Sequence, residues 1–156
     1  MNRLTNRRRR IRRGFSLIEL MTVMAVIGLL AALSVPRYRD MKRRAYSANA
    51  LSDFNTVRVA AYNYFADNST YPPDGSMGSP PAQMVQYLPQ GFSFDNGQYT
   101  LDYDVWPSPL NPTQLVVGVT VISNDQELVN MIARNVQNGG MGINVGNGYT
   151  YIFAGL

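Results

Sequence analysis

Cysteine and histidine are both absent from this chain of 156 residues. The chain therefore cannot carry the Ser-His and Cys-His pairs that activate nucleophiles, or the usual zinc ligand sets. It cannot form a disulfide either. Charge is also sparse, since only 15% of the residues are Asp, Glu, Lys or Arg. The common routes to hydrolytic and zinc-dependent catalysis are excluded, and no enzyme that depends on them is predicted.

The few charges are distributed unevenly along the chain. Residues 1–14 contain seven arginines and no acid, and Glu19 is the only charged residue among the 21 residues from Phe15 to Val35. About 20 consecutive apolar residues are enough to cross a bilayer core as a helix. Positive charge in front of a first membrane helix stays in the cytoplasm. The sequence thus predicts a single-pass membrane protein with a cytoplasmic N-terminus and a transmembrane segment at 15–35.

Glu19 is the unusual residue of the apolar run. A carboxylate inside a bilayer costs about 2.5–3.5 kcal/mol on insertion scales, so such a residue normally has a partner and a function. No Lys or Arg lies within helical reach of it on the apolar segment. One interpretation pairs Glu19 with a group on a neighbouring subunit. The alternative is that Glu19 lies near the membrane interface and extends to water.

The same stretch resembles the N-terminus of type IV pilin-like proteins, the family of pilus subunits and type II secretion pseudopilins. The resemblance covers roughly the first third of the chain, and the residues that carry it are Gly14, Phe15, Glu19, Thr22, Gly28 and Pro36. It implies that a prepilin peptidase removes the basic leader, residues 1–14, by cutting between Gly14 and Phe15. It also implies that the same enzyme methylates the new amine of Phe15. In this family a glutamate at the position of Glu19 is a hallmark.

Removal of the leader would reverse the sign of the net charge. The whole chain has 14 basic and ten acidic residues, a net +4, but seven of the basic residues lie in the leader. The remainder carries seven basic and ten acidic residues, a net −3. The basic character of the whole chain therefore gives no reason to predict nucleic-acid binding.

Residues 15–66 are predicted to form one long helix. Its first half is apolar on all sides, and the small residues around Gly28 would let helices approach closely. Pro36 lacks an amide hydrogen and should kink or loosen the helix. In the second half apolar residues recur at spacings of three and four, which defines one face that can be buried: Leu51, Phe54, Val57, Ala61 and Phe65. Charged residues such as Asp53 and Arg58 are expected mostly on the other sides.

Residues 67–156 are predicted to form a globular head. The fold class is α+β and pilin-like, with an antiparallel sheet of three or four strands packed on the amphipathic half of the helix. We expect a hairpin from Phe92 to Trp106 around Asp95-Asn96-Gly97, a strand at 114–122 and a last strand at 149–153. We also expect a short helix at 83–88, a helix at 125–136 capped by Asn124, and a glycine-rich loop at 138–148.

Two weaker patterns occur in the head. Asp95, Asp102 and Asp104 carry oxygen ligands suited to calcium, as in the head loops of some pseudopilins. A solvated strand face is the favoured interpretation, because aspartates at alternate strand positions point to water by default. Asn68-Ser69-Thr70 matches the short acceptor pattern for glycosylation. No other metal or cofactor is predicted.

The sequence therefore predicts a structural subunit of a type IV pilus-like filament. The resemblance implies its partners: other pilin-like subunits, the prepilin peptidase, an assembly ATPase and a membrane platform protein. Glu19 and the Phe15 amine would set the register between neighbouring helices. The filament would then lie in the periplasm or on the cell surface. The alternatives are a type II secretion pseudopilin, a minor pilin for adhesion or DNA uptake, and a membrane-anchored enzyme.

Overall fold

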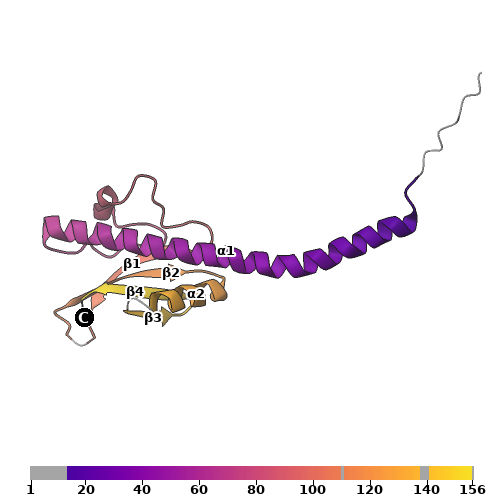
Figure 1. Cartoon of the computed structure of the whole chain (residues 1–156). Coiled ribbons are helices and arrows are strands. Elements are labelled where there is room, and N and C mark those ends of the chain that lie inside the picture. The colour runs from indigo at the N-terminus through magenta and orange to yellow at the C-terminus, as the bar shows by residue number, and fades with distance from the viewer. Residues whose placement is uncertain (1–13, 110, 138–140, 156) are drawn as a thin grey trace, which may run out of the picture. The chain divides into compact units, whose positions relative to one another are not determined.

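The computed structural model describes residues 14–109, 111–137 and 141–155 (Figure 1). The leader predicted at 1–14 lies outside these residues except for Gly14. The chain divides into two compact units, Met1–Arg39 and Asp40–Leu156. The helix α1, Leu17–Asn68, is common to both units, and its bounds lie within two residues of the predicted 15–66.

Both ends of α1 have local causes. Ser16, a residue type that favours the position before a helix, accepts the first backbone hydrogen bond from the Leu20 amide at 3.2 Å. At the other end Ser69 takes the left-handed conformation, with φ 58°, that often terminates helices. Pro36 lies inside α1, which is assigned as helix on both sides of it. The kink predicted at Pro36 stays a prediction.

The second unit contains a four-stranded antiparallel sheet in the order β1-β2-β4-β3 (Figure 1). Its strands are β1 Thr100–Pro107, β2 Leu115–Ile122, β3 Met141–Val145 and β4 Gly148–Ala154. The helix α2, Gln126–Gln137, lies between β2 and β3 in sequence, and a short 3-10 helix covers Ala82–Tyr87. The predicted fold class is confirmed, and so is the short helical turn near residue 83.

The core forms where one face of α1 meets one face of the sheet. The buried residues of α1 are Ser47, Ala50, Phe54, Val57, Ala60 and Ala61. They face strand residues that alternate with polar ones, as the pattern from Tyr99 to Asp104 predicted: Tyr99, Leu101 and Tyr103 are buried, and the residues between them are partly exposed. Phe65 is the exception to the predicted face, since its side chain is 41% exposed.

Polar contacts hold α2 beside α1. The Arg43 guanidinium donates to Asp125 Oδ2 at 2.7 Å and to Glu127 Oε2 at 2.5 Å, and Asn135 Nδ2 donates to Ser47 Oγ at 3.0 Å. The hydrogen bond from Arg43 lowers the pKa of the Asp125 carboxyl. Asp125 also accepts from the Glu127 and Leu128 amides, so Asp125 caps α2 and the prediction of Asn124 as the cap was wrong.

Three further predictions need correction. Phe92–Phe94 forms no strand, because β1 pairs with β2 and the predicted hairpin is reduced to a single bridge between Asp95 and Thr100. Within the loop predicted at 138–148, residues 141–145 form β3, which a Gly146-Asn147 turn connects to β4. Residues 138–140 lie outside the described residues. Asp53 and Arg58 face the head, since Tyr99 Oη donates to Asp53 at 2.6 Å and Arg58 donates to Tyr151 Oη at 2.9 Å.

The segment after α1 covers the outer edge of β1. The Gly75 and Gly78 amides donate to the carbonyls of Tyr103 and Leu101 at 2.9 and 2.8 Å, and the Val105 amide donates to Asp74 Oδ1 at 2.9 Å. These bonds occupy backbone groups that would otherwise pair with another chain. β4, the last strand, lies between β2 and β3, which explains how it is held without a disulfide.

Gly142 on β3 provides a test of this packing. A Cβ atom at this position would clash with Tyr149 Oη and would lie 2.6 Å from the Thr150 carbonyl oxygen, and the Tyr149 side chain is fully buried. We expect Gly142→Ala to lower the free energy of unfolding by about 1–3 kcal/mol through overpacking. Denaturant unfolding of the detergent-solubilised protein, followed by circular dichroism, measures this. Ile143→Ala, at an exposed neighbouring residue, should change the free energy of unfolding by less than about 0.5 kcal/mol. If the two substitutions lowered it equally, the packing argument would be contradicted.

Candidate processing and assembly segment

The predicted cleavage position lies in front of α1 and is open to solvent. Gly14, Phe15 and Ser16 precede the first helical residue, Leu17, and all three are exposed. The Phe15 side chain is 79% exposed, and a Cβ added to Gly14 would meet no atom within 4 Å. No described residue covers the bond between Gly14 and Phe15, so the fold leaves it accessible to a peptidase.

Glu19 lies in the first turn of α1 and is exposed. Ser16 and Glu19 have the spacing of a capping box, in which the two residues bond to each other's backbone. The structure contains no such bond, and within residues 14–109, 111–137 and 141–155 every ion pair belongs to Arg43. The positive end of the helix dipole favours a carboxylate here. Glu19 is therefore available for a cation supplied from outside the described chain.

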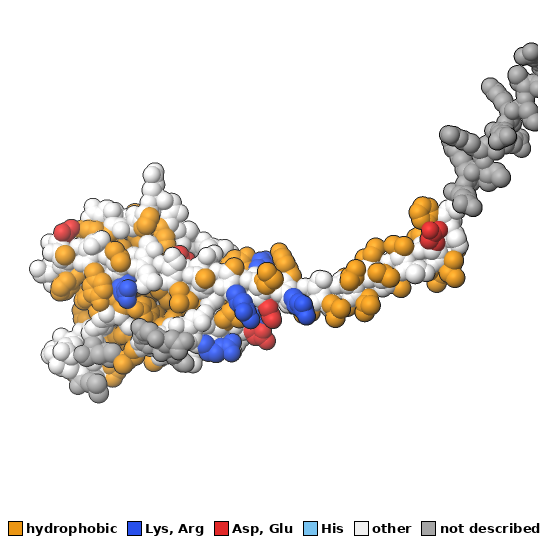
Figure 2. Space-filling view, in the orientation of Figure 1, with side chains coloured by type: hydrophobic (Ala, Val, Ile, Leu, Met, Phe, Trp, Pro, Cys, Tyr) orange, Lys and Arg blue, Asp and Glu red, His pale blue; other side chains and the backbone are white. Residues whose placement is uncertain are grey.

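The first half of α1 presents apolar side chains on all sides. Figure 2 shows hydrophobic side chains along the visible face of this part of the helix, with one acidic side chain near its start. Its large apolar residues are between 48% and 79% exposed: Phe15, Leu17, Ile18, Leu20, Met21, Val23, Met24, Val26, Ile27, Leu29, Leu30, Leu33 and Val35. Thr22 hides its hydroxyl by donating to the Ile18 carbonyl at 2.8 Å. Contiguous apolar surface of this kind marks a membrane or protein contact.

Length and composition also allow this helix to cross a membrane. Its most apolar window has a mean hydropathy of 2.3, and none of that window is buried by the rest of the described chain. A core helix of a soluble protein would be covered, so an apolar anchor explains the exposure better.

Comparisons with known proteins agree with this arrangement. Residues 9–35 match the model of the prokaryotic N-terminal methylation motif. The type II secretion system core protein G of Pectobacterium carotovorum is 34% identical over 107 residues, which are 65% of this chain and 69% of that protein. The type IV major pilin protein PilE1 of Neisseria gonorrhoeae is 29% identical over 112 residues, or 70% of this chain and 61% of the pilin.

The chain belongs to the type IV pilin-like family. A shorter match, to the fimbrial protein EcpC of Eikenella corrodens, is 35% identical over 68 residues, or 44% of each chain. The pilin-like chain thus spans 44% and 61% of the lengths of EcpC and PilE1. No solved structure matches it significantly. The membership confirms the resemblance based on Gly14, Phe15 and Glu19, and the methylation motif indicates processing by a prepilin peptidase.

The three aspartates predicted as weak calcium ligands do not meet in one place. Asp95 lies in its own turn, where its Oδ1 accepts from the Gly97 amide at 2.9 Å. Asp104 accepts from the Thr120 hydroxyl at 2.5 Å, and Asp102 lies near Asp104 and Asp74. The described part of the chain contains no group of three or more His, Cys, Asp or Glu side chains that could hold a metal ion. Calcium binding at these residues stays a prediction.

Sequence reasoning missed the residues that connect α1 to the head. Asp53 and Arg58 were expected mostly away from the head, and no partner was predicted for Arg43, yet each bonds to a residue at least 46 positions away. The helix at 125–136 was predicted, but its acids Asp125 and Glu127 were not predicted as partners of Arg43. Of these contacts, only the pairing of Arg43 could have been suggested by the sequence, because a basic residue on the long helix and two acids at the start of α2 have opposite charges.

Burial, followed by the charges of Asp104 and Asp74, raises the pKa of Asp102 to about 6. The folded state therefore binds this proton more tightly than the unfolded state, whose aspartates titrate near about 3.9. The contribution of Asp102 to stability is present below about pH 4 and is lost as the pH rises through about 6.

We expect Asp102→Asn to raise the unfolding midpoint at pH 7.5 and to change it little at pH 4, because the protonated acid and the amide are both neutral. Thermal unfolding at the two pH values measures the difference. Asp95→Asn, in an exposed turn, is the matched control. If Asp102→Asn raised the unfolding midpoint by the same amount at both pH values, the titration of Asp102 would not be the cause.

Proposed function

We propose that this chain is a structural subunit of a type IV pilus-like filament. The observation that carries the proposal is the apolar surface from Phe15 to Val35, which the described part of the chain leaves uncovered and which contains an unpaired Glu19 near its start. Lipid would cover this surface before assembly, and the same segments of other copies would cover it afterwards.

Processing creates the partner that Glu19 lacks. Cleavage after Gly14 removes the seven leader arginines and leaves an amine on Phe15. The amine of one copy and Glu19 of a neighbouring copy would then pair in a low-dielectric core, where an ion pair is stronger than in water. A buried charge without its partner is costly, so this pair would select one axial register between neighbouring helices.

The other partners and the location follow from the same proposal. Processed copies would wait in the inner membrane as single-pass proteins, and an assembly ATPase with a membrane platform protein would extract them into the filament. The family consists of structural subunits, and we propose no enzymatic role for this chain.

A second candidate is a pseudopilin of a type II secretion system. The observation that favours it is the match to core protein G of Pectobacterium carotovorum, which extends over 69% of that protein and so reaches well beyond the N-terminal segment. Both candidates require the same processing and the same helix packing. Adhesion and DNA uptake gain no support from a processed chain with a net charge of −3.

Processing can be tested by intact mass and N-terminal sequencing of the protein from its native membrane. We expect residues 1–14 to be missing and the amine of Phe15 to carry one methyl group. A Gly14→Lys variant serves as the control and should retain the leader, because a long side chain replaces the glycine at the predicted cleavage bond. An intact N-terminus on the unchanged protein would remove the main support for the filament.

The role of Glu19 can be tested by filament yield. Glu19→Gln keeps the size of the side chain and removes its charge, so we expect at least about a tenfold loss of sheared filaments, which corresponds to about 1.4 kcal/mol per contact. Met21→Gln also places an amide in the apolar segment but leaves the carboxylate, and it should assemble well. If both variants lose filaments equally, polarity rather than pairing explains the effect.

A further inference from the structure

Basic residues are scarce in the head, although acids are common there. Residues 45–156 contain eight Asp and Glu but only two basic residues, Arg58 and Arg134. An arginine among so many acids would be expected to pair with one of its own subunit. Arg58 does not, since none of the ion pairs among the described residues includes it.

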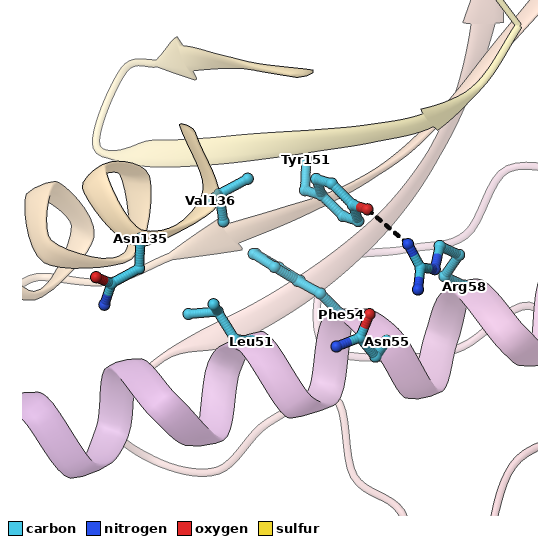
Figure 3. A pocket seen from close by; sticks show the side chains of 7 residues that line it. All are labelled: Leu51, Phe54, Asn55, Arg58, Asn135, Val136 and Tyr151. Atoms are coloured by element: carbon cyan, nitrogen blue, oxygen red, sulfur yellow. Dashed lines mark hydrogen bonds between the residues drawn. The ribbon is translucent and has the colours of Figure 1, made fainter. Parts of the chain in front are cut away.

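Arg58 lies at a small cavity between α1, α2 and β4, drawn in Figure 3. The cavity has a volume of about 170 Å³. Its apolar wall comes from Leu51, Phe54 and Val136, and its polar side from Asn55, Arg58 and the Tyr151 hydroxyl. Pockets for drug-sized ligands are larger, about 300–1,000 Å³. This cavity, called the Arg58 pocket below, is therefore of a size that suits a single side chain.

The chemistry of the Arg58 pocket suits a carboxylate on a short aliphatic stem. Arg58 gives one hydrogen bond, to the neutral Tyr151 hydroxyl at 2.9 Å, and a guanidinium has five N–H groups. Asn55 is exposed and adds amide donors at the rim, whereas Asn135 is already bonded to Ser47. Donors that converge beside apolar walls would hold the charge of an acid and bury its methylene groups.

Most acids of the chain already have a partner inside their own subunit. The acids that accept hydrogen bonds there are Asp53, Asp67, Asp74, Asp95, Asp104, Asp125 and Glu127. Of the remaining three outside the leader, Glu19 lies in the apolar segment, and Asp102 is partly buried on the sheet. Asp40 is the exposed acid that remains outside the apolar segment. Its nearest cation, Arg43 Nη1, lies 4.0 Å away and makes a shorter contact with Glu127.

We propose that in the assembled filament the Arg58 pocket binds the Asp40 carboxylate of another copy of this chain. Asp40 and Arg58 both lie on α1, 18 residues apart, which is five turns at 3.6 residues per turn and about 27 Å along the helix axis. They therefore lie on the same side of the helix, and they cannot meet within one chain. A parallel copy offset by about five turns would bring its Asp40 level with this Arg58.

This inference rests on the proposed function, because it needs parallel copies packed through α1. It adds a second register contact to the pair formed by Glu19 and the Phe15 amine. A single contact near the helix start fixes the position of one end of α1. A second contact within the head unit would also fix how neighbouring heads are spaced.

The absence of cysteine allows a direct test. Asp40→Cys and Arg58→Cys together place two thiols about 27 Å apart on one helix, and a disulfide requires Cα atoms within about 7 Å. Any disulfide must therefore join two copies. We expect oxidised filaments of the double variant to give a ladder of multimers in non-reducing electrophoresis, and each single variant to give dimers at most. The control pair Asp40→Cys with Arg134→Cys should give no ladder, and filaments without a ladder from the first pair would overturn the proposal.

Charge reversal supplies a second, independent readout in the full-length chain. Arg58→Glu and Asp40→Lys should each reduce filament yield by at least about tenfold, as expected for the loss of an interfacial ion pair, and the double variant should recover most of it. Arg134→Glu reverses the other basic residue of the head, which does not line the Arg58 pocket, so its yield should stay near that of the unchanged protein.

The outcomes separate this proposal from the function on which it rests. If the double reversal does not recover, or if Arg134→Glu loses as much yield as Arg58→Glu, the loss does not come from a pair between Arg58 and Asp40 and the proposal fails. Either result leaves the filament function standing, because the unchanged protein still polymerises. If the unchanged protein forms no filament under any condition, the proposed function fails first and this inference fails with it.

Discussion

Burial of one face of α1 against the sheet is the contact on which the head depends. Phe54 and Val57 of α1 are almost completely buried in the core of the head, and burying each such side chain stabilises the fold by about 1.5–3 kcal/mol. The polar contacts of Arg43 and Asn135 then orient α2 beside the same helix. Because α1 also carries the apolar segment, the helix that completes the core of the head is the one that carries the surface for membrane and filament contacts.

The two halves of α1 differ in how their apolar side chains are covered, although both are helical. From Ser47 to Ala61 the buried residues fall on one face, and the chain itself supplies what covers them. From Phe15 to Val35 every side is apolar and the described residues cover none of it. Such a surface suits a helix that is surrounded by lipid before assembly and by the same helices of other copies afterwards. Both environments are apolar on every side, so a helix with one polar face would fit neither.

The sequence was most informative where its pattern is long. The apolar run, the amphipathic half of α1 and the strand β2 each extend over eight or more residues, and their positions were predicted closely, as was the shorter strand β4. The errors lie where a pattern is short. Gly146-Asn147 is a recognised two-residue hairpin turn, with a positive φ of 56° at Gly146, but the surrounding glycines favoured a loop and β3 was missed. Other errors depend on which distant strand or helix lies alongside a segment, and no local pattern contains that information. They are the strand wrongly predicted at Phe92–Phe94 and the unpredicted partners of Arg43, Asp53 and Arg58. The prediction of the processing residues did not depend on the fold, because residue types and spacing alone define that motif.

The position of β4 has a consequence for the time at which the protein becomes folded. β4 is the last strand in sequence but lies inside the sheet, where it pairs with β2 on one side and β3 on the other. The core facing α1 therefore cannot be completed before residues 148–154 are present. Without β4, Phe54, Val57 and the valines of β2 lose part of their cover together, and apolar surface exposed in this way makes an incomplete chain prone to aggregation.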